Sequence, residues 1–84
     1  MAATPQDLDN WIMSGRMSGS RWIIVARDTE GNDDYPIYLE EDEDLRNNVV
    51  FYHGVNLQEV REVLSLEPDR LVKHLTPESV LDSK

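Results

Sequence analysis

The sequence predicts a small α+β domain over residues 1–84, built from an N-terminal helix, an antiparallel β-hairpin and two to three C-terminal helices. Two apolar runs rich in β-branched and aromatic residues, at 22–26 and 35–39, lie on either side of a polar stretch, which is typical of a hairpin. Apolar residues at helical spacing follow start signals near both ends of the chain. Because 84 residues support only one modest hydrophobic core, we expect a single domain.

The N-terminal helix is predicted to begin at Thr4, a suitable N-cap, with Pro5 at its first position. Its apolar face is expected to contain Leu8, Trp11 and Ile12. Either Gly15 or Gly19 can end this helix. The glycines and serines of residues 14–20 then predict a flexible linker.

The two apolar runs predict the two strands of the hairpin. The first strand is expected over residues 21–26, and both of its faces are apolar, which indicates a central strand covered on each side. One face contains Trp22, Ile24 and Ala26, and the other contains Ile23 and Val25. The second strand, residues 35–39, contains Pro36, which has no N–H for a sheet ladder, so we expect this strand at an edge.

Residues 49–53 fit two interpretations. Their composition is typical of a third strand. The competing interpretation is a helix over residues 41–54, with an acidic first turn, a C-cap at Gly54 and an apolar face of Leu45, Val49 and Tyr52. If the helix forms, the second edge of the first strand stays open and favours either a homodimer or the binding of a partner through that edge.

The C-terminal third of the chain predicts helices. Asn56 and Glu59 have the spacing of a capping box, and the following residues to position 66 are expected to bury Leu57, Val60, Val63 and Leu64. A shorter helix over residues 68–75 is expected to bury Leu71, Val72 and Leu75. Thr76 starts a third helix.

The hairpin stretch carries a pattern of its own: Asp28 and Thr29 end the first strand, and Asp34, Tyr35 and Pro36 open the second. With these residues, the chain resembles a group of small uncharacterised bacterial and phage proteins over roughly residues 7–66. The resemblance implies a helix over residues 43–53 and a phage or mobile-element context, in which small acidic proteins act as inhibitors or accessory factors. It implies no specific activity.

The charge of the chain excludes several classes of partner. Seventeen acidic residues against eight basic ones give a net charge of −9. Such a surface repels nucleic acid and anionic lipid, so we expect neither direct nucleic-acid binding nor membrane binding, and favour a protein partner with a basic surface. The chain has no cysteine and no apolar run of the ~20 residues that a membrane helix needs, which favours a cytoplasmic location.

The sequence offers no catalytic set. It has no cysteine, its glycines are isolated rather than grouped in a phosphate loop, and its two histidines, His53 and His74, have no recognisable nucleophile beside them. We therefore expect a protein that is not an enzyme and holds no cofactor.

The polar stretch between the strands raises the question of a metal site. Its oxygen-bearing side chains are Asp28, Glu30, Asn32 and Asp33. Counted from Asp28, the glycine and the twelfth-position glutamate of a calcium loop are not in place, because Gly31 is fourth and Leu39 is twelfth. We therefore expect a hairpin loop with no metal, and a divalent-ion loop stays as an alternative.

Partner binding is predicted at eight residues, which are Asp33, Asp34, Tyr38, Glu40, Glu41, Asp42, Glu43 and Asp44. The acids among them form two poles, ~15–20 Å apart, at the two ends of the second strand. The leading hypothesis is a non-catalytic interaction protein that binds and inhibits a cytoplasmic protein. The alternative is a nucleic-acid mimic that blocks a basic groove.

Overall fold

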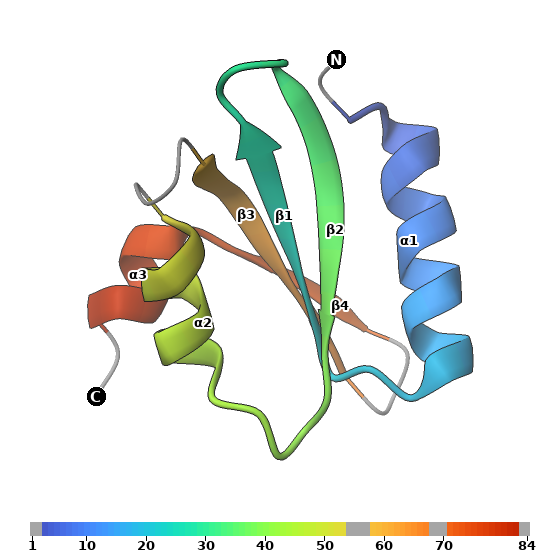
Figure 1. The fold of residues 1–84 in the computed structure, drawn as a ribbon. Coiled ribbons are helices and arrows are strands. Elements are labelled where there is room, and N and C mark those ends of the chain that lie inside the picture. The colour runs from blue at the N-terminus through green and yellow to red at the C-terminus, as the bar shows by residue number, and fades with distance from the viewer. Residues whose placement is uncertain (1–2, 54–57, 68–70, 83–84) are drawn as a thin grey trace.

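The computed structural model describes residues 3–53, 58–67 and 71–82. It is an α+β fold in which a four-stranded antiparallel sheet of order β2-β1-β3-β4 has helices on both faces (Figure 1). The elements in chain order are α1 (Pro5–Ser18), β1 (Trp22–Asp28), β2 (Asp33–Leu39), α2 (Leu45–Tyr52), β3 (Gln58–Leu66), β4 (Val72–Leu75) and α3 (Pro77–Asp82). The predicted class, N-terminal helix and hairpin are confirmed.

Helix α1 begins as its sequence predicts. The Oγ1 atom of Thr4 accepts the N–H of Asp7 at 3.1 Å, and the carboxylate of Asp7 accepts the N–H of Thr4 at 3.0 Å. This reciprocal capping box satisfies two N–H groups that a helix start leaves unpaired. The predicted apolar face, Leu8, Trp11 and Ile12, packs against the sheet.

The expected flexible linker over residues 14–20 is wrong, because the helix runs through most of it and ends only at Gly19. Gly19 has φ +80°, the left-handed conformation that glycine adopts most easily. Gly15 is buried, and a Cβ at this position would lie 3.0 Å from Leu66 and 3.1 Å from Ile23. Close packing on the sheet therefore holds a stretch whose composition alone is typical of a linker.

Strand β1 is central and covered on both faces, as predicted. Beneath α1, Ile23 and Val25 pack with Leu64 and Leu66. On the opposite face, Ile24 belongs to a second cluster that α2 and α3 cover and that also contains Leu39, Val49, Val60, Val63 and Val80. Strand β2 lies at the sheet edge, which confirms the position inferred from its proline.

Residues 49–52 are helical, since α2 covers residues 45–52 and buries Val49. The helix is shorter than predicted, because Asp44 is its N-cap, His53 is its C-cap and its first turn contains no acidic residue. The expected open edge of β1 is nevertheless wrong, because β3 pairs with it. The free edges of the sheet belong to β2 and β4, so the premise for a homodimer through β1 is lost.

The helix predicted from Asn56 to residue 66 is wrong for its described part, which is strand β3. Val25 pairs with Glu62 while the next residue, Ala26, pairs with Val60. Arg61 is thus an extra residue in β3, a β-bulge. The predicted N-cap, Asn56, lies outside the described residues.

The helix predicted over residues 68–75 is also wrong in its described part, where residues 72–75 form β4 and pair with β3. Val72 packs beneath α1, whereas Leu75 joins the cluster on the opposite face. The third predicted helix is present as α3, beginning one residue after Thr76. None of the described helices is both long and apolar enough to cross a membrane.

Candidate partner-binding surface

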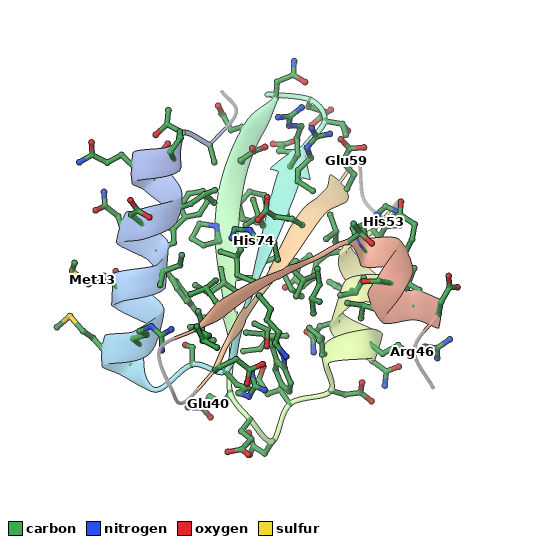
Figure 2. The ribbon with its side chains drawn as sticks, turned by 180° about the vertical axis from the view of Figure 1, so that it is seen from behind. Met13, Glu40, Arg46, His53, Glu59 and His74 are labelled. Carbon is green, nitrogen blue, oxygen red and sulfur yellow. The ribbon has the colours of Figure 1, made fainter. Side chains whose placement is uncertain are left out.

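The predicted acidic residues lie at the two ends of β2. Asp33 and Asp34 begin the strand beside the hairpin turn, and the acidic segment, residues 40–44, follows its far end (Figure 1). Figure 2 shows Glu40 at the end of the sheet away from Glu59, which lies near the hairpin turn. The fold therefore keeps the two groups of acids apart, as expected from the length of the strand.

Asp34 is engaged in hydrogen bonds within the chain. Its side chain is 6% exposed, and its two oxygens accept the Nε–H of Arg27 and the N–H of Ala3, both at 2.8 Å. Burial alone raises the pKa of Asp34, but the hydrogen bonds from Arg27 and Ala3 and the charge of Arg27 outweigh it and lower the pKa. The same hydrogen bond raises the pKa of Arg27. Little of this carboxylate is left for a partner.

The hairpin loop is organised by its own backbone. The N–H of Asn32 donates to the carbonyl of Asp28 at 2.7 Å, and the N–H of Glu30 donates to the Asp28 carboxylate at 2.9 Å. Asn32 takes φ +58°, which asparagine tolerates better than most residues. Asp28 and Asn32 therefore stabilise the turn of the hairpin. Within the described ranges, no group of three or more His, Asp or Glu side chains is placed to hold a metal ion.

The acidic segment presents its side chains to solvent. Asp44 is also exposed, but its carboxylate caps α2 by accepting the N–H of Asn47 at 3.1 Å and the side-chain amide of the same residue at 2.9 Å. The carboxylates of the other four residues accept no hydrogen bond from any described part of the chain, and they are Glu40, Glu41, Asp42 and Glu43. Four neighbouring negative charges are thus left to solvent.

The basic side chains that the structure describes are bonded within the chain. Five of them donate hydrogen bonds to a carboxylate, a hydroxyl or a main-chain carbonyl, and they are Arg16, Arg21, Arg27, Arg46 and Arg61. Lys73 forms an ion pair with Glu67 at 3.6 Å. Two of the arginines share a hollow of about 210 Å³ with Glu41. There, however, the guanidiniums of Arg16 and Arg21 are directed to the main chain and side chain of Glu67.

A mostly apolar groove of about 580 Å³ lies beside the acidic segment, where α2 begins next to β4 and α3. We call it the α2–α3 groove. Its floor contains the buried Val80 and the half-buried Leu45 and Leu75. Four exposed residues complete its lining, and they are Glu43, Asp44, Arg46 and Ser79. The groove thus shares Glu43 and Asp44 with the predicted binding residues.

Tyr38 lies elsewhere. It is 38% exposed and pairs with Ile23, whose side chain points to the face beneath α1. The flanking Ile37 and Leu39 point to the face that α2 and α3 cover. Tyr38 and the α2–α3 groove therefore lie on opposite faces of the sheet.

The sequence does not predict the groove, because its patterns place Leu75 in a helix rather than in β4. Its floor joins three segments that only the sheet topology brings together. Comparison with known proteins adds nothing to it, since no family model, no curated protein and no solved structure matches the chain.

Proposed function

We propose that this chain is a non-catalytic acidic interaction protein that binds a basic surface of a cytoplasmic protein and modulates its activity. The observation that carries the proposal is the row of four solvent-directed carboxylates at residues 40–43, beside the α2–α3 groove. Complementary charge of this kind speeds encounter and selects partners, while an apolar groove supplies the buried contact that gives affinity. The rest of the net charge of −9 adds a long-range field of the same sign.

The two histidines lie on different elements. His53 ends α2, and its Nδ1 accepts the N–H of Val60 at 3.3 Å. His74 lies on β4, where its Nδ1 is 2.9 Å from an oxygen of Glu62. Figure 2 shows the two side chains on different elements. Each imidazole therefore contacts a group of the sheet, and the two do not form a joint acid–base pair.

A second proposal uses the same four carboxylates. In it, they stand in for phosphates and occupy a nucleic-acid-binding groove of the partner. The observation that favours it is the closeness of the charges, since the N–H of Glu43 donates to the carbonyl of Glu40 in a tight turn.

Charge neutralisation tests the first proposal. The variant replaces Glu40, Glu41 and Glu43 by Gln and Asp42 by Asn. Its matched control neutralises four exposed acids outside the segment, namely Asp9, Glu30, Glu78 and Asp82. Both proteins are used as bait in a cytosolic extract, beside the wild type. We expect the wild type and the control to retain the same protein and the variant to lose it. Equal capture by the two variants contradicts the proposal.

Competition then separates the two proposals. The captured partner is saturated with this protein, and its binding to DNA or RNA is measured by fluorescence anisotropy. Loss of nucleic-acid binding supports the mimic, whereas unchanged nucleic-acid binding contradicts it and leaves the interaction protein.

A further inference from the structure

We propose that the α2–α3 groove docks a short segment of the partner that carries a large apolar side chain flanked by Lys or Arg. This proposal rests on the proposed function and names the chemistry of the segment that the acidic surface receives. In this proposal, the groove selects the partner segment, and the acidic residues alone do not.

The groove has the size and lining of a binding pocket. Pockets that bind ligands typically span roughly 300–1,000 Å³ and are lined mainly by apolar side chains, and the volume here is about 580 Å³. Leu45, Leu75 and Val80 come from three different elements, so the apolar floor is fixed by the packing of α2, β4 and α3. A leucine or phenylalanine side chain of a partner would remove this apolar surface from water.

The charges around the groove define the flanks of that segment. Glu43 lines the groove, and the three acidic residues before it in the chain are Glu40, Glu41 and Asp42. The carboxylates of these four residues form no ion pair within the described part of the chain. A Lys or Arg next to the apolar anchor meets these acids. Arg46 is the one basic residue of the lining, and its Nε donates to the carbonyl of Leu81 at 3.3 Å. We therefore expect the basic flank of the segment on the Glu43 side.

A second copy of this chain fits the groove poorly. Two molecules of net charge −9 repel each other, and the approach to the groove passes the acidic segment of the receiving copy. A basic partner segment is attracted by the same charges. Charge complementarity thus selects this occupant over self-association.

Synthetic peptides test the chemistry directly. The first probe is a nine-residue peptide with two leucines among lysines. The second has serines in place of the leucines, and the third has glutamates in place of the lysines. Each is titrated into the ¹⁵N-labelled full chain, and the amide shifts are followed by NMR. We expect the leucine–lysine peptide to shift the amides of Leu45, Arg46 and Ser79, with both other peptides binding roughly tenfold more weakly or worse.

Two variants locate the binding. Ser79→Trp places a large side chain in the groove from an exposed position of α3, and Glu43→Lys reverses the charge of the lining. The control is Glu30→Lys, which makes the same charge change in the hairpin loop at the other end of the sheet. We expect both groove variants to weaken the leucine–lysine peptide at least tenfold and the control to change its affinity little. The dispersion of the amide spectrum checks whether each variant is folded.

The outcomes distinguish the inference from the proposed function. Equal binding of the serine–lysine peptide, or shifts confined to residues 40–43, overturns groove docking but leaves acidic partner binding intact. Equal binding of the leucine–glutamate peptide overturns the basic flank. Amide shifts in the groove that grow with protein concentration alone assign it to a second copy and overturn the proposal. Absence of binding by all three peptides at millimolar concentration overturns it as well, while the extract experiment still decides the proposed function.

Discussion

The Nε atom of Arg27 lies 2.8 Å from an oxygen of Asp34, and the two residues face each other across β1 and β2. The second oxygen of Asp34 accepts the N–H of Ala3, just before α1. One carboxylate therefore connects the hairpin to the segment that leads into the helix. It does so with its side chain almost fully buried, so the loss of either bond leaves a polar group poorly solvated.

Asp34→Asn keeps the shape of the side chain but removes the charge that attracts Arg27. We expect the variant to lose about 1–3 kcal/mol of unfolding free energy, the usual loss when a buried charged hydrogen bond is broken. Urea denaturation followed by tryptophan fluorescence measures it. Glu30→Gln, an exposed site in the neighbouring loop, is the control and should change stability little. A loss no larger than that of the control contradicts the structural role of Asp34.

The same bond gives a pH dependence of known sign. The pKa of Asp34 is lowered in the folded chain, so the unfolded state binds its proton more readily. The stabilisation is complete above the unfolded pKa of about 3.9 and is lost as the pH falls through the lower folded pKa. We expect the stability difference between wild type and Asp34→Asn to be constant near neutral pH and to shrink below about pH 4. A difference that grows on acidification rules this out.

Arg21 is expected to contribute more to stability than Arg61. One nitrogen of Arg21 donates to the hydroxyl of Ser65 at 2.7 Å, and another donates to Glu67 at 3.3 Å. Ser65 is 4% exposed, so removing Arg21 deprives a buried hydroxyl of its best partner. Arg21→Ala should cost about 1–2 kcal/mol. Arg61→Ala breaks an exposed pair with Glu59 and removes a weak attraction to Asp34, so it should change the urea midpoint little. Equal effects of the two substitutions contradict this ranking.

Gly15 sets the distance between α1 and the sheet. A Cβ there would lie 3.0 Å from Leu66 and 3.1 Å from Ile23, so the branched side chain of Gly15→Val would force these core side chains or the helix to shift. We expect a loss of about 1–3 kcal/mol in thermal or urea unfolding, as in other overpacked cores. Ser14→Val is the matched control, because it places the same side chain on the exposed face of the same helix. A neutral Gly15→Val would mean that α1 packs less closely.

Local signals sufficed for about half of the fold. The cap at Thr4, the apolar strand over residues 22–26 and the proline of β2 each depend on neighbouring residues, and each prediction is confirmed. The prediction of a helix at β3 is wrong for a specific reason. Its bulge at Arg61 shifts the alternation by one residue, so that Val60 and Val63 point to the same core cluster. Two buried residues three apart are typical of a helix, and the sequence alone does not show the bulge.

Strand β4 and the groove could not be predicted for a different reason. Residues 72–75 are a strand because they pair with β3, and a sequence pattern that predicts a helix at β3 offers them no strand to pair with. The α2–α3 groove in turn requires Leu75 beside Leu45 and Val80, which no local pattern brings together. For the predicted site, charge identified the acidic segment but could not show that Asp34 and Asp44 are engaged in internal bonds.

The edges of the sheet limit how this protein can aggregate. On one side, Pro36 removes a donor from the middle of β2, so an incoming strand finds an interrupted row of hydrogen bonds. On the other side, β4 offers only four residues before Thr76 and Pro77 lead into α3. Fibril growth by strand addition needs a long and continuous template. Neither edge strand that the structure describes provides one, so polymerisation through these edges would first require the fold to open.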